Sequence, residues 1–248
     1  CAPRVDEAYA LWAGSLAADG KMGCLRHPVT QDGVFPVLSE HAKGATAKDL
    51  KEFYHVYSWG RVPDNLSNMT RQLYGDLVTL GQELLGWLDN EMPADVRDRM
   101  TAPLSSMMDE REQNLLRILH YPPLSEELEK GAEDSTAIRA AAHEDINLIT
   151  LLLAGSKPGL EAQDTDGRWH NVPCDPGMIT INNGDMLSLA TNGFYPSTTH
   201  RVVNPERTQN SARYSMPMFL HPRPDVALTQ GFTADMFLQQ RLREIGLK

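Results

Sequence analysis

The chain has 248 residues, a formal net charge of −10 at neutral pH and an ordinary hydrophobic content of 41%. That length suffices for one sizeable domain, because barrel and sandwich folds of this size are often single units. The acidic balance argues against nucleic acid as the main partner, and the lack of an apolar run of about 18 residues argues against a membrane span.

The three cysteines bear on the cellular compartment. Cys1, Cys24 and Cys174 are widely spaced and form no C-x-x-C pair. An odd number of scattered cysteines is typical of reduced thiols in the cytoplasm. We therefore expect a cytoplasmic protein that acts on a small molecule, without nucleic acid or membrane as a partner, and we expect it to be a monomer.

The first part of the chain is predicted to be mainly helical. Residues 4–18 have helix-like spacing, and residues 47–53 are predicted to form a short helix with Thr46 as a candidate cap. The clearest helix spans residues 65–89, where apolar side chains recur every three or four positions: Leu66, Met69, Leu73, Leu77, Leu80, Leu84 and Leu88. This stripe indicates packing against a core. Pro93 suits the first turn of a further short helix that ends near Met108.

From residue 114 onward the pattern becomes that of strands. Residues 115–121 are a strand candidate, which Pro122 ends. Arg117, Leu119 and Tyr121 share one face of that strand, because side chains alternate. If Tyr121 faces a pocket, Arg117 faces it too; an outward ion pair is the alternative for Arg117.

Short strands separated by turn signals follow. Asp166-Gly167 marks a hairpin between residues 159–163 and 169–172, because Gly tolerates the positive φ that such a turn requires. His170 on this hairpin is expected to be exposed. Further strands are predicted at residues 148–154, 178–181, 186–189, 198–203 and 214–220, before a helix at 233–245 with Thr233 as its cap. This succession favours a jelly roll or barrel.

His143, Asp145 and His200 are candidate ligands of one metal ion. Side chains at positions i and i+2 of a strand point to the same face, so His143 and Asp145 can face one ion while Glu144 turns away. His200 follows Asp145 by 55 positions, far enough for several strands to return to the same place. Two imidazoles and one carboxylate leave coordination positions open, as non-haem Fe(II) sites require. A zinc-protease helix is excluded, because its second histidine would fall on Asn147.

Arg213 and Ser215 repeat the same spacing on a later segment. The Arg fork binds a carboxylate through two parallel hydrogen bonds, and the Ser hydroxyl can complete the contact. The pair therefore predicts a site for a carboxylate-bearing cosubstrate, without naming its occupant.

Further stretches belong with these motifs: Glu40 to Gly44, Asp49 to Phe53, Leu116-Arg117, Tyr121-Pro122-Pro123, Ala142 to Thr150, Asn183 to Leu187, Thr191-Asn192-Gly193, His200 to Pro205 and Arg213-Tyr214-Ser215. Together they resemble the isopenicillin N synthase-like family of Fe(II)- and 2-oxoglutarate-dependent oxygenases, in its bacterial form. The likeness covers nearly the whole chain from about residue 35.

The resemblance implies one oxygenase domain over residues 1–248, mainly β with flanking α. Its core would be a double-stranded β-helix, a cupin-like jelly roll, at about residues 111–225, with the long helix packed on the outside. A helical and lid region would precede it at about residues 1–110, and a helix at about 233–246 would follow. Residues 21–45 would be a substrate lid or an ordinary surface loop. Relatives usually begin with a further strand-rich segment, so part of the N-terminus is expected to be missing before Cys1.

The resemblance also assigns roles within the site. Fe(II) would be held by the two histidines and the aspartate named above, with no other catalytic residue. 2-Oxoglutarate would bind Arg213 and Ser215 with Tyr121 close by, although His120 replaces an Asn that many plant relatives have before this tyrosine. O₂ would be the oxidant, and ascorbate would serve as reductant in vitro. The candidates for the substrate pocket are Arg117, Phe194, Tyr195 and Phe219.

The expected reaction oxidises a small molecule by hydroxylation, desaturation or oxidative cyclisation, with succinate and CO₂ as coproducts. The nearest alternative is an isopenicillin N synthase-like oxidase, in which Arg213 and Ser215 would hold a carboxylate of the substrate itself. A non-enzymatic jelly-roll binding protein is a more distant alternative, and it would have no reason to keep all three ligands and the arginine. A zinc hydrolase is disfavoured, because zinc sites use tetrahedral sets of His and Cys and no positioned Glu base is evident.

Overall fold

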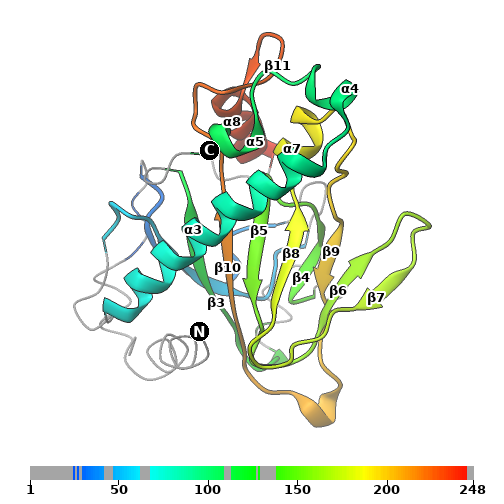
Figure 1. The fold of residues 1–248 in the computed structure, drawn as a ribbon. Coiled ribbons are helices and arrows are strands. Elements are labelled where there is room, and N and C mark those ends of the chain that lie inside the picture. The colour runs from blue at the N-terminus through cyan, green and yellow to red at the C-terminus, as the bar shows by residue number, and fades with distance from the viewer. Residues whose placement is uncertain are drawn as a thin grey trace.

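Two β-sheets face each other across a cavity, and helices cover the outside (Figure 1). The computed structural model describes residues 25, 27, 30–41, 47–61, 68–108, 113–126, 128 and 138–244. Several predicted features lie outside the described residues, namely the helix at residues 4–18, Thr46, Leu66, Cys1 and Cys24. The predicted double-stranded β-helix with flanking helices is confirmed.

The larger sheet has six strands in the order β1-β2-β3-β10-β5-β8, each antiparallel to its neighbours. The strands are β1 (Gly33–Phe35), β2 (Glu52–Val56), β3 (Leu115–Tyr121), β10 (Arg213–Leu220), β5 (Ile149–Leu153) and β8 (Ile179–Asn183). β3 has the predicted bounds, and β5, β8 and β10 lie within a residue or two of theirs. β10 is a central strand that pairs with β3 on one side and β5 on the other.

The smaller sheet has four strands in the order β4-β9-β6-β7. The strands are β4 (Ala140–His143), β9 (His200–Val202), β6 (Leu160–Gln163) and β7 (Trp169–Asn171). β6 and β7 are the predicted hairpin, and Gly167 in its turn has a φ of 80°. β4 pairs with β9 so that His143 lies opposite His200. Two predicted metal ligands are therefore cross-strand neighbours.

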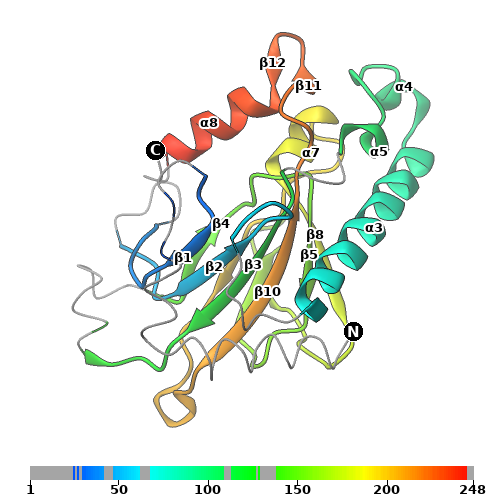
Figure 2. The same cartoon turned by 90° about the vertical axis from the view of Figure 1, so that its left-hand side faces the viewer.

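Helix α3 (Asn68–Glu91) packs against the outer face of the larger sheet (Figures 1 and 2). Its buried side is formed by Thr70, Leu73, Tyr74, Leu77, Val78, Gly81 and Leu85. Leu73 and Leu77 of the predicted stripe are in this face, whereas Met69 is exposed. The buried face is therefore rotated slightly from the predicted one. A Cβ on Gly81 would overlap the side chain of Leu220, so the glycine allows α3 to approach β10 closely.

Most of the remaining elements surround the upper end of the sheets in Figure 2, namely α4 (Ala94–Arg97), α5 (Leu104–Met107), α7 (Asp185–Ala190), β11 (Ala227–Thr229), β12 (Phe232–Thr233) and α8 (Ala234–Glu244). The short 3-10 helix η1 (Arg207–Gln209) lies at the opposite end. Thr233 accepts a hydrogen bond from the Met236 N–H at 3.3 Å, as predicted for the cap of α8. No helix in the described part of the chain is long and apolar enough to cross a membrane.

Alternation along the central strand separates the core from the cavity. Met216, Met218 and Leu220 of β10 point outward into the apolar core with α3. The intervening positions, from Arg213 to Phe219, point inward and line the space between the sheets. Because side chains alternate between the two faces of β10, one face contributes to the hydrophobic core and the other to the polar site.

Two predicted elements are wrong. Residues 47–53 were expected to be helical, but Glu52–Val56 is β2, whose aromatic and β-branched residues fit between β1 and β3. Residues 186–189 were expected to form a strand, but Asp185–Ala190 is α7, which buries Met186, Leu187 and Ala190 at helical spacing. Within the described part of residues 1–110, β1 and β2 extend the larger sheet.

Candidate metal centre and active site

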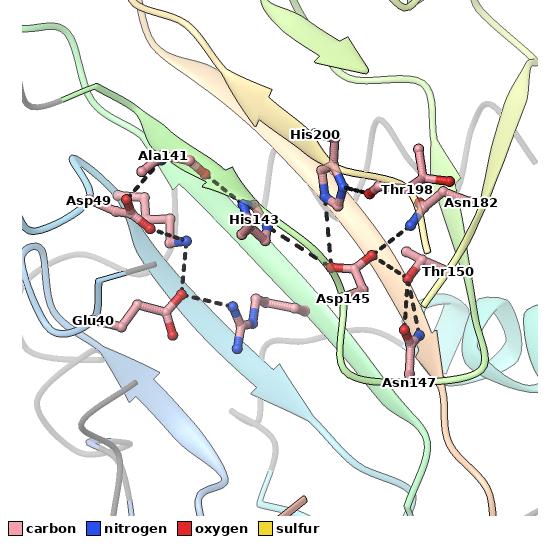
Figure 3. A network of polar contacts seen from close by, with 12 residues as sticks. Glu40, Asp49, Ala141, His143, Asp145, Asn147, Thr150, Asn182, Thr198 and His200 are labelled. Carbon is pink, nitrogen blue, oxygen red and sulfur yellow. Dashed lines mark hydrogen bonds and ion pairs between the residues drawn. The ribbon is translucent and has the colours of Figure 1, made fainter. Parts of the chain in front are cut away.

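The three predicted ligands converge at the cavity between the sheets. His143 ends β4, His200 begins β9 opposite it, and Asp145 follows β4 by two residues. One ligand atom from each residue lies within 4.8 Å of the other two. Oδ1 of Asp145 is 4.0 Å from Nε2 of His143 and 3.7 Å from Nε2 of His200 (Figure 3). Two nitrogens and one carboxylate oxygen therefore face a common point.

Backbone carbonyls orient both imidazoles. Nδ1 of His143 donates to the carbonyl of Ala141 at 2.7 Å, and Nδ1 of His200 donates to the carbonyl of Thr198 at 3.0 Å (Figure 3). A carbonyl oxygen can only accept, so each Nδ1 carries a proton and each Nε2 is the ring nitrogen left to coordinate a metal ion. Metal-binding histidines are typically held in this way.

Asp145 is fixed through one of its two oxygens. Its Oδ2 accepts a hydrogen bond from the Thr150 hydroxyl at 2.6 Å and another from the Asn182 amide at 2.9 Å. The Asn147 amide in turn donates to the Thr150 hydroxyl oxygen at 3.0 Å. Gly184 makes room for this arrangement, because a Cβ there would overlap the backbone and side-chain oxygens of Asn147. Oδ1 of Asp145 is thus left for a metal ion.

Burial and mutual electrostatics keep His143 and Asp145 in the protonation states that bind metals. Burial lowers the pKa of His143 to about 4, and the neighbouring His200 acts in the same direction. Burial alone would raise the pKa of Asp145, but the two imidazoles and the hydrogen bonds from Asn182 and Thr150 bring it below its ordinary value. A neutral imidazole and an ionised carboxylate are the forms that coordinate a metal ion.

A small cavity of about 80 Å³ extends from these ligands to Arg213 and Ser215, with Tyr121 in its wall. Arg213 is only 2% exposed, and its Nε donates to the carbonyl of Lys157 at 3.0 Å. Nη1 of Arg213 is buried without a hydrogen-bond partner among the described residues. An unpaired buried guanidinium nitrogen is costly, so this end of the cavity fits an oxygen-bearing anion. The Tyr121 ring centre lies 5.2 Å from the guanidinium carbon of Arg213.

Two residues that the sequence did not single out lie close to Arg213 at this end of the cavity. Gly155 lies against Arg213, where a Cβ would come within 2.8 Å of Nη2. Arg139 is buried nearby, and burial together with the charge of Arg213 lowers the pKa of Arg139. Two guanidinium groups thus make this end locally positive in an acidic protein. Neither residue has a local sequence signal, because both act through a contact made by folding.

A larger cavity of about 410 Å³ also reaches His143 and Asp145. The predicted pocket residues Arg117 and Phe219 line both this cavity and the smaller one. The wall of the larger cavity also includes residues of helix α8, namely Leu238, Arg241 and Leu242. The C-terminal helix therefore covers part of this cavity.

Phe194 and Tyr195, the other two residues predicted for the substrate pocket, are not among the residues that line these two cavities. The Tyr195 hydroxyl donates to the carbonyl of Leu88 on α3 at 3.1 Å, and Phe194 is 41% exposed. Both residues follow α7, the helix that the sequence indicated as a strand. A strand would have returned them to the sheet, whereas the chain after the helix brings Tyr195 to α3.

A buried ionic network, which the sequence did not reveal, joins the larger cavity to the metal centre. Nζ of Lys51 lies 2.8 Å from Oε1 of Glu40 and 2.8 Å from Oδ2 of Asp49. Nη1 of Arg117 lies 3.0 Å from the same Glu40 oxygen. The other oxygen of Asp49 accepts the N–H of Ala141 at 3.0 Å, on the strand that carries the first histidine (Figure 3).

The network is electrostatically self-consistent. Burial alone would raise the pKa of Glu40, but Arg117 and Lys51 lower it to about 2. Burial alone would lower the pKa of Lys51, but Asp49 and Glu40 raise it above its ordinary value. Glu40 and Lys51 therefore stay charged near neutral pH, and each of these buried charges is paired with a group of opposite sign.

Asp49→Ala is expected to weaken the binding of Co(II), a spectroscopic probe of such sites, by about tenfold, because Asp49 accepts the N–H of Ala141, the residue whose carbonyl orients His143. The measurement is an absorption titration in oxygen-free buffer. Asp89→Ala is the matched control, because Asp89 also accepts backbone N–H groups, at the start of α5. Equal Co(II) affinities in the two variants would contradict this role for Asp49.

Comparisons with known proteins agree with this geometry. Residues 112–222, which include all three ligands and Arg213, match the model of the 2OG-Fe(II) oxygenase superfamily. Among solved structures, a Shewanella oneidensis protein assigned as an oxygenase is 44% identical, with a TM-score of 0.83, over 98% of this chain and 87% of that one. A 2OG-Fe(II) oxygenase family protein of Caulobacter crescentus is 34% identical, with a TM-score of 0.72, over 98% and 84% of the two chains.

The chain is also similar to a 2-oxoglutarate-dependent dioxygenase of Monascus ruber. The two are 40% identical over 115 residues, which are 46% of this chain and 33% of that protein. The chain thus spans about a third of the length of this curated relative.

Proposed function

The chain belongs to the 2OG-Fe(II) oxygenase superfamily, and from that membership we propose that it oxidises a small molecule with Fe(II), 2-oxoglutarate and O₂. One observation carries the proposal: two imidazole nitrogens and one carboxylate oxygen face a common point, and the adjoining cavity ends at a guanidinium. Such a set holds Fe(II) on one side and leaves positions open for a cosubstrate and O₂.

In this proposal, the triad of His143, Asp145 and His200 holds the iron. Arg213 and Ser215 bind the far carboxylate of 2-oxoglutarate. The unpaired Nη1 of Arg213 supports this assignment, because a carboxylate would supply the missing acceptor. The second guanidinium at this end of the cavity, that of Arg139, adds to the attraction for a doubly charged cosubstrate.

The bound iron supplies the activation of O₂ and the oxidation of the substrate, while 2-oxoglutarate is converted to succinate and CO₂. The residues of the chain provide orientation. The carbonyls of Ala141 and Thr198 keep the two Nε2 atoms aimed at one point, and the bonds from Thr150 and Asn182 hold Oδ1 of Asp145 there. A site fixed in advance loses little entropy when its ligands bind.

The substrate is proposed to bind in the larger cavity. That cavity reaches His143 and Asp145, but its lining does not include Arg213 or Ser215. Two cavities that meet at the same ligands suit a cosubstrate and a separate substrate. An oxidase that holds its only organic substrate at Arg213 would not need the second space, so the two-cavity arrangement favours the 2-oxoglutarate-dependent reaction.

Succinate formation tests the proposal. Purified protein with Fe(II), ascorbate and air is expected to convert 2-oxoglutarate to succinate slowly, because such enzymes often turn over without their prime substrate. Candidate small molecules would then be screened for faster turnover while O₂ uptake is followed. O₂ uptake that required a small molecule but not 2-oxoglutarate would favour the oxidase instead. Failure to bind Fe(II) at all would contradict both enzymatic readings.

A further inference from the structure

The larger cavity contains polar atoms for which the described part of the chain offers no partner. Part of its wall comes from the adjacent strands β3 and β10, which contribute Leu115, Arg117 and Phe219, and from His221 just beyond β10. Leu115 and Phe219 are paired across the two strands. In this register, Arg117 and His221 lie on either side of that apolar pair. Their remaining hydrogen-bonding capacity indicates what the cavity can bind.

Arg117 is a donor fixed in direction. Its Nε donates to Nε2 of His55 at 3.0 Å, its Nη1 donates to Glu40 at 3.0 Å, and its guanidinium carbon lies 4.2 Å from the centre of the Phe53 ring. His55 can accept because its Nδ1 donates to the carbonyl of Gln31. No described residue accepts from Nη2 of Arg117. This nitrogen is therefore preorganised to donate to a ligand oxygen.

His221 is an acceptor fixed in direction. Its Nδ1 lies 3.3 Å from the carbonyl of Phe219, which can only accept, so Nδ1 carries the proton and Nε2 presents a lone pair. Burial lowers the pKa of His221 to about 4, which keeps the imidazole neutral near neutral pH. No described residue donates to Nε2. This atom therefore suits an N–H or O–H group of a ligand.

The charges around Arg117 balance. Arg117 and Lys51 are paired with the carboxylates of Glu40 and Asp49, so the group carries no net charge. An anion would gain less here than beside Arg213, whose Nη1 has no partner among the described residues. Oε2 of Glu40, another residue of the cavity lining, is buried without a partner among the described residues and adds a second acceptor. The wall thus favours a polar ligand without net charge.

We propose that the larger cavity binds a small uncharged molecule that carries a carbonyl oxygen together with an N–H or O–H group, as amides, lactams and hydroxyketones do. The carbonyl oxygen accepts from Nη2 of Arg117, the N–H or O–H group donates to Nε2 of His221, and the carbon skeleton packs on Leu115 and Phe219. As a statement about the substrate, this inference rests on the proposed function. As a statement about binding, it is tested without turnover.

A pair of lactams provides the test. 2-Piperidone carries both groups, whereas N-methyl-2-piperidone keeps the carbonyl and lacks the N–H. Their dissociation constants are measured by saturation-transfer NMR on protein that holds Zn(II) and saturating 2-oxoglutarate. The measurement is repeated on protein to which neither Zn(II) nor 2-oxoglutarate has been added. 2-Piperidone is expected to bind about fivefold more tightly, the contribution of about one hydrogen bond. Equal affinity for the two lactams, or binding of neither, would overturn the proposal whatever the succinate assay gives.

Two variants separate the contacts. Arg117→Lys can keep the ion pair with Glu40 but loses the second guanidinium nitrogen. It is expected to lower the affinity for both lactams about fivefold. His221→Leu is expected to remove the preference for 2-piperidone. Arg99→Lys is the matched control, because Arg99 is exposed, pairs with Asp95, and is not among the residues that line this cavity. If Arg117→Lys changed only the affinity for 2-oxoglutarate, Arg117 would belong to the cosubstrate site and the proposal would fail.

Discussion

His200→Ala is expected to abolish metal binding and succinate formation together. The change removes one of two imidazoles and leaves a single histidine and Asp145 to hold the ion. Loss of a residue that merely supports a ligand commonly costs about 10- to 100-fold in metal affinity, so loss of a ligand should exceed the upper end of that range. Co(II) absorption and succinate production would measure the two effects separately.

The matched control is His170→Ala. His170 is the exposed histidine predicted for the β6–β7 hairpin; its side chain is 61% exposed, and its Nε2 lies 2.6 Å from Asp164. The control should bind Co(II) and form succinate as the wild type does. If His200→Ala behaved like the control in both assays, His200 would not be a ligand and the proposed site would be wrong.

Arg213→Lys is expected to raise the KM for 2-oxoglutarate by about 10- to 100-fold, because a charged hydrogen bond within a bidentate pair is lost and an ammonium cannot replace the fork. Arg117 also lines the smaller cavity, but its Nη1 is paired with Glu40, whereas Nη1 of Arg213 has no partner among the described residues. Co(II) binding should change little, since Arg213 does not contribute a ligand atom to the triad. Initial rates of succinate formation over a range of 2-oxoglutarate concentrations give the KM.

Arg201→Lys serves as the control for this change. Arg201 is paired with Glu161 at 2.7 Å and stacks over Trp169, so it tests the general effect of replacing a well-packed arginine. Gly155→Ala offers an independent perturbation of the anchor, because its Cβ would press on Nη2 of Arg213. An unchanged KM in Arg213→Lys would show that another group holds the carboxylate.

The sequence predicted the parts of the fold that have local signals. The Asp166-Gly167 turn, the strand at residues 115–121 and the long helix each follow from periodicity or from turn chemistry, and the structure confirms them. The helix expected at residues 47–53 was wrong because pairing with β1 and β3 decides the conformation of Glu52–Val56. The strand expected at residues 186–189 was wrong because a short apolar run fits either element.

The candidate site shows the same division. The i, i+2 spacing predicted that His143 and Asp145 share a face, and the structure brings them together with His200. The network that supports them could not be predicted, because Glu40 and Lys51 meet Arg117 only after three separate segments have packed. Periodicity reports which side of an element a residue faces, and it does not report what lies opposite.

Pro217 in the middle of β10 has a consequence for how such a protein can diversify. A proline lacks the N–H that a ladder needs, and the pairing of β10 with β3 skips from Ser215 to Met218 while the pairing with β5 continues. Arg213 and Ser215 precede the interruption, and Phe219 and His221 follow it. Exchange of the segment after Pro217 between homologous genes would therefore change the residues of the proposed substrate cavity. The residues of the proposed cosubstrate site, which precede Pro217, would stay the same. Members with different substrates can thus arise without changes along the whole strand.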